Sequence, residues 1–176
     1  LPYVLQQINV PVYGTRLTLA LIEGKLRERG LDRMVKLNVQ AFGDTVDFGD
    51  IKVEFIKTNH SIQDAAALAI FTPAGTIIHT GDFKVDYTPV FGDPIDLQRF
   101  AELGKEGVLA MMSDSTNATK PGSTMSERTV GGTFERIFAE HQQNRIIVAT
   151  FASNVDRVQQ IINTAAKYKR KVVVEG

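Results

Sequence analysis

Residues 67–82 read ALAIFTPAGTIIHTGD, and this stretch predicts the centre of a β-sheet. Two apolar runs, Ala67–Thr72 and Thr76–Thr80, flank the segment Pro-Ala-Gly, which is typical of a hairpin turn. The second run is followed by a glycine and then by Asp82, so a carboxylate comes directly after a strand. Loops that follow strands often carry functional groups. The stretch therefore predicts a β-hairpin that presents an acid at one of its ends.

The residues before this hairpin favour short strands and one helix. A helix is expected to begin at Thr15, as its N-cap, and to end before Gly30. Strands are expected over residues 10–14, 36–39, 46–50 and 51–56. In the last of these, apolar and polar residues alternate, which predicts one buried face.

After residue 92 the pattern changes. Asp96 can cap a helix, and the apolar run Val108–Met112 is typical of a buried strand. A polar loop follows, and we place a change of organisation near residues 115–125. Beyond it, helix and strand alternate, which predicts parallel sheet. The expected elements are a helix over 126–139, a strand over 145–150, a helix over 155–166 and a strand over 171–174.

The composition restricts the possible chemistry. The 176 residues contain no cysteine and three histidines, so a metal ion would have to bind imidazole and carboxylate groups. Lys and Arg balance Asp and Glu at 20 each, and net charge therefore gives no argument for a nucleic-acid partner. No apolar run reaches the roughly 20 residues of a membrane span, and the first residues lack the basic segment of a signal peptide.

Two residues are the main candidates for metal binding. His60 follows the strand expected over 51–56, and Asp82 follows the hairpin. Each has a plain structural alternative, a solvent-facing loop histidine and a turn aspartate that bonds its own backbone. Taken together they could meet at one edge of a sheet and bind zinc or manganese. Two ligands are fewer than the three that a catalytic zinc normally has.

The remaining polar segments are open to more than one interpretation. His79 is expected to be a structural histidine bonded to backbone, and His141 to be a solvated residue at a helix end. The loop Ser113–Asn117 could bind phosphate oxygens or orient metal ligands, or it could simply be turn-rich. Ser153 and Asn154 could cap a helix, contact phosphate, or do both.

The basic segment Lys167–Lys171 also has two readings. It could contact an RNA backbone, because four of its five side chains are cationic and the fifth is aromatic. The alternative is the solvated end of a helix before a strand, and this is the interpretation that we favour.

Five phrases of the sequence, taken in order, resemble bacterial ribonuclease J. They are Thr58-Asn59-His60-Ser61-Ile62, Ile78-His79-Thr80-Gly81-Asp82-Phe83-Lys84, Ser113-Asp114-Ser115-Thr116-Asn117, Met125-Ser126-Glu127-Arg128 and Ala149-Thr150-Phe151-Ala152-Ser153-Asn154. The likeness extends over essentially the whole chain, which makes it more specific than any single phrase would be.

The resemblance implies an α/β (α+β) fold, a partial metallo-β-lactamase αββα sandwich followed by the start of a β-CASP parallel β-α-β domain. The corresponding ranges are 1–122 and 123–176. By this resemblance His60 is a terminal metal ligand, and Asp82 is a catalytic residue that bridges two metal ions. Ser153 and Asn154 fall in a phrase near the RNA path and are substrate-binding candidates.

The resemblance also implies an activity. Two Zn²⁺ ions per full-length active site, with Mn²⁺ as a possible substitute, would activate a water molecule for phosphodiester hydrolysis. The substrate would be RNA, degraded from its 5′ end and cut internally during RNA decay and maturation. A cytoplasmic location is implied, as is a homo-oligomer or a hetero-oligomer with a paralogue, without membrane association.

The chain departs from the family pattern in its metal ligands. It lacks the His-x-His-x-Asp-His motif and the later ligand histidine, and keeps two of seven expected ligand residues. The chain alone is therefore expected to be inactive. One alternative is a non-catalytic paralogue that binds RNA or a partner subunit. A metallo-β-lactamase hydrolase acting on a thioester or a lactam is a further alternative, against which the β-α-β pattern after residue 125 argues.

Overall fold

The computed structural model describes residues 1–175, which form two compact units. Unit 1 comprises Leu1–Thr58, Asp64–Phe83 and Asp96–Asp114, and unit 2 comprises Asn59–Gln63, Lys84–Ile95 and the residues from Ser115 onward. Each unit is described by itself. No helix within residues 1–175 is both long enough and apolar enough to cross a membrane.

Unit 1 begins with a small β-α-β arrangement. Strand β1 (Val12–Gly14) pairs in parallel with β2 (Leu37–Val39), and α2 (Arg16–Arg27) connects them. The short helix α1 (Pro2–Leu5), which the sequence pattern did not predict, precedes β1. Buried apolar side chains from α1, α2 and the connection to β2 form the core of this part: Leu5, Leu26, Leu31 and Val35.

The start of α2 is held by a residue distant in the sequence. Thr15 is the N-cap, as predicted, but its hydroxyl makes no cap hydrogen bond. Instead the Asp64 carboxylate accepts a hydrogen bond from the Leu17 N–H at 2.8 Å, and Thr15 Oγ1 donates to the Asp64 carbonyl at 2.9 Å. An aspartate 47 residues away therefore satisfies a free backbone donor of the first helical turn.

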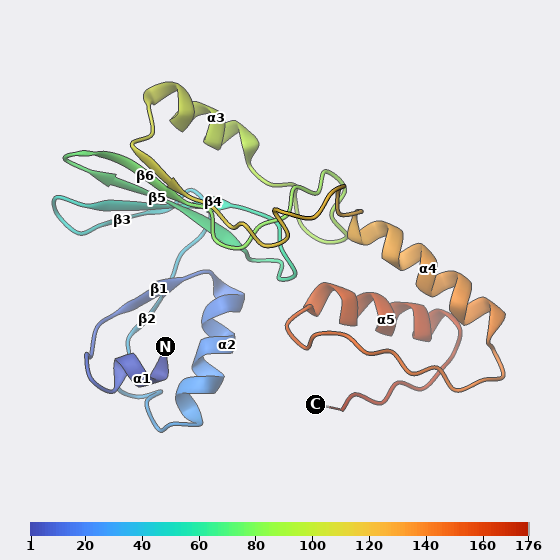
Figure 1. The fold of residues 1–176 in the computed structure, drawn as a ribbon. Helices are drawn as coiled ribbons and strands as arrows, with labels where there is room; N and C mark the ends of the chain where they lie inside the picture. The colour runs from blue at the N-terminus through green and yellow to red at the C-terminus, as the bar shows by residue number, and fades with distance from the viewer. Residues whose placement is uncertain (176) are drawn as a thin grey trace. The chain divides into compact units, whose positions relative to one another are not determined.

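The second part of unit 1 is a five-stranded sheet (Figure 1). Its strands, in the order in which they neighbour one another, are β3 (Thr45–Asp47), β4 (Lys52–Lys57), β5 (Ala66–Thr72), β6 (Gly75–His79) and β7 (Ala110–Met112). The first three pairings are antiparallel, and β6 pairs with β7 in parallel. The hairpin predicted around Pro73 is confirmed, with Ile70 opposite Ile77.

Helix α3 (Leu97–Glu106) packs on this sheet, and Asp96 caps it as predicted, by accepting a bond from the Arg99 N–H. Leu103 of α3 is 1% exposed and joins Ile56, Ala67, Ala69 and Ile78 in the core. On the same element the Arg99 guanidinium donates to both oxygens of Glu54, at 2.8 and 2.9 Å.

This pairing corrects the prediction of one buried face for β4. Glu54, Phe55 and Ile56 are consecutive, so their side chains alternate between the two faces, yet all three are buried. The reason is that Arg99 neutralises the Glu54 carboxylate, which allows a polar position of the alternating pattern to be covered by a helix.

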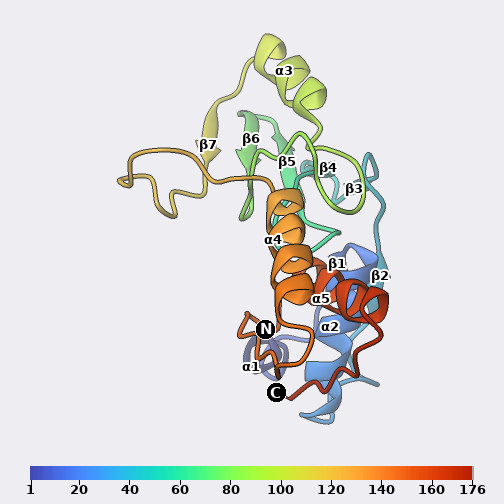
Figure 2. The same ribbon diagram turned by 90° about the vertical axis from the view of Figure 1, so that its right-hand side faces the viewer.

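The prediction that Val108–Met112 is a buried strand is wrong in its burial. The strand exists, but its residues Ala110, Met111 and Met112 are all exposed. Figure 2 shows β7 beside β6, and the strand order places it at the edge of the sheet. A continuous apolar run does not distinguish a central strand from an edge strand whose outer side has no neighbour among residues 1–175.

Unit 2 contains two helices packed against each other, α4 (Glu127–Glu140) and α5 (Val155–Lys167). They can be followed in Figure 1 as the orange and red helices. A close approach between them occurs at Gly131, where an added Cβ would lie 2.5 Å from Oε1 of the buried Gln160. A side chain at residue 131 would therefore require the Gln160 side chain to move.

The strands predicted over residues 145–150 and 171–174 are not present. Both segments run without assigned strand structure, before and after α5, within the residues that the structure describes. A strand requires a neighbouring backbone with which to pair, and neither segment has one here. The mixed α/β class is confirmed by the helices and the two sheets.

Candidate functional site

Asp82 lies at the end of the pairing between β6 and β7 in unit 1. The ladder continues one residue beyond β6, because the Thr80 N–H donates to the Met112 carbonyl at 3.0 Å. The loops after both strands therefore start from the same edge of the sheet, the edge where open α/β sheets bind ligands. The Asp82 side chain is exposed.

A glycine turn separates Asp82 from the strand. Gly81 has φ of +61°, and a Cβ there would lie 3.0 Å from the Ala66 carbonyl oxygen. The Gly81 N–H donates to Nδ1 of His79 at 3.0 Å. His79 is thus a structural histidine bonded to backbone, as predicted, and this bond helps to hold the turn before Asp82.

The polar loop after β7 is joined to this turn. The Asp114 N–H donates to Thr80 Oγ1 at 3.0 Å, across 34 residues of sequence. Beyond it the chain makes a tight turn in which Asn117 has φ of +63° and the Lys120 N–H donates to the Asn117 carbonyl. The polar segment predicted after a strand is therefore present, with part of its backbone held by the neighbouring strand.

His60 lies in unit 2, in the short segment Asn59–Gln63. Its ring is exposed, and Nδ1 is 3.2 Å from the Ser61 hydroxyl, which leaves Nε2 as the nitrogen for another partner. His60 helps to line a small cavity of unit 2 together with loop residues and residues of α4 and α5. The other lining residues include Asn59, Lys84, Asp86, Phe91, Glu127 and Asp156.

An ion-pair cluster beside this cavity was not predicted from the sequence. Both oxygens of Glu127 accept hydrogen bonds from one guanidinium nitrogen of Arg157, at 2.9 and 3.0 Å. Lys84 lies 3.5 Å from Glu127 and donates to the Met125 carbonyl at 2.6 Å. We call Lys84, Asp86, Glu127 and Arg157 the unit 2 charge cluster. Since they lie up to 73 positions apart in the sequence, no local pattern signals the cluster.

Asp86 is the buried member of the charge cluster. Burial raises the pKa of its carboxyl, but hydrogen bonds from Thr88, Ser126 and the Glu127 N–H, together with the charge of Lys84, outweigh burial. The pKa of Asp86 therefore lies below its ordinary value of 3.8. The opposite holds for Asp156, where burial and then the neighbouring Glu127 raise the pKa.

Asn154 is the N-cap of α5, and its buried side chain accepts a hydrogen bond from the Arg157 N–H at 3.1 Å. Of the two roles considered for this residue, capping is the one that the structure shows. Ser153 precedes it and is exposed. A contact of either residue with RNA stays a prediction.

The basic segment Lys167–Lys171 begins with the last residue of α5 and contacts α4 and the turn that follows α4. Lys167 pairs with Glu135, and Arg170 donates to the carbonyls of His141, Gln142 and Asn144. His141 is the exposed C-cap of α4, as expected for a helix-end residue. Arg170 thus places a cation at the carboxyl end of α4, a favourable arrangement.

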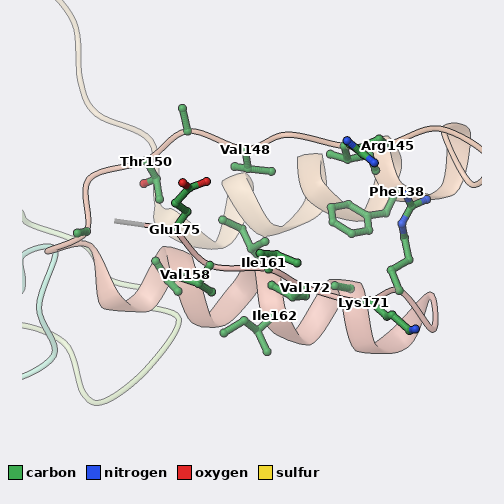
Figure 3. A pocket seen from close by; sticks show the side chains of 17 residues that line it. Phe138, Arg145, Val148, Thr150, Val158, Ile161, Ile162, Lys171, Val172 and Glu175 are labelled. Atoms are coloured by element: carbon green, nitrogen blue, oxygen red, sulfur yellow. The ribbon is translucent and has the colours of Figure 1, made fainter.

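A groove of about 410 Å³ runs along α5 in unit 2. Figure 3 shows apolar side chains from three segments gathered along it, among them Val148, Ile161 and Val172. Its walls are the segments before and after α5, where the sequence predicted strands.

The described residues do not by themselves form a metal centre. Among residues 1–175 no group of three or more His, Asp or Glu side chains is placed to hold a metal ion. His60 belongs to unit 2 and Asp82 to unit 1, and their convergence on one cation stays a prediction. The side chains present therefore do not fit a complete catalytic zinc site, which needs at least three protein ligands.

Comparison with known proteins finds a family model and several curated relatives that all carry the name ribonuclease J. Residues 143–176 match the family described as ribonuclease J, β-CASP domain. Ribonuclease J 1 of Streptococcus pyogenes is 49% identical over 176 residues, which is 100% of this chain and 31% of that protein. Ribonuclease J of Helicobacter pylori is 46% identical, with 99% of this chain and 25% of that protein covered. Ribonuclease J2 of Bacillus subtilis is 44% identical over 174 residues, 99% of this chain and 31% of that protein.

By these matches the chain is similar to the β-CASP domain of ribonuclease J over residues 143–176, and to ribonuclease J proteins over its whole length. The resemblance to ribonuclease J is thus confirmed along the whole chain. The chain spans less than a third of the length of these curated relatives. A solved structure of a protein of unknown function from Enterococcus faecalis has a TM-score of 0.66 over 88% of this chain and 39% of that chain. At 20% identity, that likeness shows the fold alone.

Proposed function

We propose that this chain is a segment of a metal-dependent ribonuclease that hydrolyses phosphodiester bonds in RNA. The observation that carries the proposal is the placement of Asp82, directly after a glycine turn of positive φ at the carboxyl edge of the parallel pair β6 and β7. A carboxylate fixed at such an edge is suited to bind a cation. The names of the relatives support the same activity.

In this proposal Asp82 and His60 are metal ligands. Carboxylate and imidazole are ligands that zinc accepts, and manganese is the alternative ion. The proposed role of His60 as a metal ligand is supported by its Nε2, which the contact between Nδ1 and Ser61 does not use. The chain alone does not supply the three ligands of a catalytic site, so we propose that it does not hydrolyse RNA by itself.

The remaining parts of the proposal concern the whole enzyme. Its substrate would be RNA, cut from the 5′ end and internally, with Ser153 and Asn154 close to the RNA path. It would act in the cytoplasm as a homo-oligomer or with a paralogous subunit. These statements are supported by the family resemblance and by the ribonuclease names of the relatives.

A segment exchange tests the proposal. Residues 1–176 would replace the matching segment of Streptococcus pyogenes ribonuclease J 1, which is 49% identical to this chain. The exchanged enzyme is expected to degrade 5′-monophosphorylated RNA, and Asp82→Asn or His60→Ala in it is expected to abolish the activity and lower the bound zinc or manganese.

Two matched controls accompany these variants. Asp50→Asn changes an exposed loop aspartate, and His141→Ala changes an exposed histidine at a helix end. Both are expected to retain activity and metal content. An exchanged enzyme that folds and binds metal normally with Asn at position 82 would contradict the proposed ligand role.

The second candidate is a non-catalytic paralogue, and the observation that favours it is the lack of a three-ligand group among residues 1–175. The gene sequence upstream of the Leu1 codon discriminates between the two. An intact His-x-His-x-Asp-His motif there supports the enzyme, and a disrupted motif supports the paralogue.

A further inference from the structure

The loops after β6 and β7 are connected through one side chain. Thr80 is 7% exposed, and its hydroxyl donates to the Gly81 carbonyl at 2.7 Å. The same oxygen accepts a hydrogen bond from the Asp114 N–H at 3.0 Å. The backbone N–H of Thr80 donates to the Met112 carbonyl, so this residue bonds to the end of β7 through its backbone and to the loop after β7 through its side chain.

The geometry points to Thr80 as a positioning residue that holds the turn before Asp82 against Asp114, at the start of the loop after β7, so that these two segments of unit 1 are held together. One part of the inference rests on the proposed function, namely that Asp82 binds a cation. The connection itself follows from bonds within unit 1.

A simple packing role would not require the hydroxyl. Valine has nearly the shape of threonine, and at a buried position it would fill the same space. It would remove the hydrogen bonds from the Thr80 hydroxyl to the Gly81 carbonyl and from the Asp114 N–H to that hydroxyl, both of which are part-buried, and the loss of such a bond is destabilising. The hydroxyl is therefore the part of Thr80 that distinguishes positioning from packing.

The sheet itself contains a matched control at its opposite end. In the turn between β5 and β6, Thr72 Oγ1 donates to the Gly75 carbonyl at 2.9 Å and accepts from the Ala74 N–H at 3.2 Å. Thr72 thus has the same donor and acceptor pattern as Thr80, but its bonds stay within one hairpin and do not join two separate loops.

The test is backbone amide hydrogen exchange, measured by NMR on the 176-residue chain without metal or RNA. In Thr80→Val, exchange at the Asp114 amide is expected to rise about tenfold, and the Asp82 resonance is expected to shift, because the loss of one hydrogen bond is of that order. Thr80→Ser keeps the hydroxyl and is expected to restore both values. Thr72→Val is expected to change Ala74 and to leave Asp82 and Asp114 as they are.

Unchanged exchange at Asp114 in Thr80→Val, or failure of Thr80→Ser to restore it, would overturn the inference. If Thr80→Val does not fold, the wild-type chain decides, since the Thr80 hydroxyl proton should exchange slowly and show a nuclear Overhauser effect to the Asp114 amide. Absence of that signal would overturn the inference as well. Neither measurement needs metal or RNA, so a failure of the proposed ribonuclease function would leave these outcomes unaffected.

Discussion

The two units differ in how their extended segments are used. In unit 1, five segments pair into a sheet, and helix α3 covers it with the buried Leu103. In unit 2, the segments before and after α5 remain unpaired, and Val173 is 90% exposed. The comparison teaches that apolar, strand-like sequence forms strands only where a partner strand is present, while amphipathic helices such as α4 and α5 form in either setting.

The units also differ in how charge is handled. Unit 1 places one bidentate ion pair, Arg99 with Glu54, between a helix and the sheet. The charge cluster of unit 2 joins the starts of α4 and α5 to a loop through Glu127, Arg157 and Lys84. Substitutions in the sheet core, the ion pairs and the turns show which of these features contributes most to the free energy of unfolding of each unit.

The largest expected effect is on the sheet core. Leu103→Ala removes a side chain that is 1% exposed and leaves a cavity against Ile56 and Ile78, which should lower the free energy of unfolding by about 3 kcal/mol. Val173→Ala in unit 2 should change it by less than about 0.5 kcal/mol. Urea denaturation followed by circular dichroism measures both, and equal effects would remove the contrast between the units.

The next effect concerns the ion pair on β4. Arg99→Met keeps the aliphatic stem but leaves the Glu54 carboxylate buried without its partner, which should cost about 2 kcal/mol of unfolding free energy. Adding Glu54→Leu should recover most of that loss. The exposed pair Arg27 with Glu23 is the control, and Arg27→Met should have little effect. If Arg99→Met lowers the free energy of unfolding no more than Arg27→Met does, the Glu54 carboxylate is solvated and does not depend on Arg99.

A similar or slightly smaller effect is expected at the turn before Asp82. Gly81→Ala places a Cβ at positive φ and 3.0 Å from the Ala66 carbonyl, which should cost about 2 kcal/mol. Gly43 also has positive φ, but nothing lies within 4 Å of an added Cβ there, so Gly43→Ala should cost about 1 kcal/mol. Thermal unfolding of both variants checks the difference, and equal losses would mean that the contact with Ala66 contributes nothing.

The smallest effect is in unit 2, at Asp86. Its two carboxylate oxygens accept bonds from the Thr88 and Glu127 N–H groups, and Asp86→Asn replaces one acceptor with a donor, at a cost of about 1 kcal/mol. Since the folded-state pKa is lowered, the charge stabilises the fold above the ordinary value of 3.8. The difference between wild type and Asp86→Asn should be full at neutral pH and should vanish as the pH falls through the lowered pKa. A difference that stays constant down to pH 2 would contradict this assignment.

Local signals predicted much of the fold. The hairpin around Pro73 and the helices begun by Asp96 and Ser126 follow from turn and capping residues, which act within a few positions. Pairing is different, because a strand depends on what lies beside it. This is why apolar runs could not predict the exposure of β7, or the absence of strands before and after α5 within residues 1–175.

The site was predictable to a similar degree. The position of Asp82 after an apolar strand and the backbone bond of His79 could be anticipated from the sequence, while the metal-binding role of Asp82 stays a prediction. The bond from Asp114 to Thr80 and the Arg157 pairing with Glu127 join residues 34 and 30 positions apart, which no spacing rule predicts. Long-range polar contacts of this kind appear only once the chain has folded.

The most direct test of the central claim is a metal titration of the 176-residue chain combined with a nuclease assay. Zinc or manganese would be added to the chain and to full-length Streptococcus pyogenes ribonuclease J 1, each with 5′-monophosphorylated RNA. We expect the full-length enzyme to degrade the RNA and the chain to show no metal-dependent turnover, because residues 1–175 supply no three-ligand group. Turnover by the chain at a rate comparable to the full-length enzyme would contradict the account.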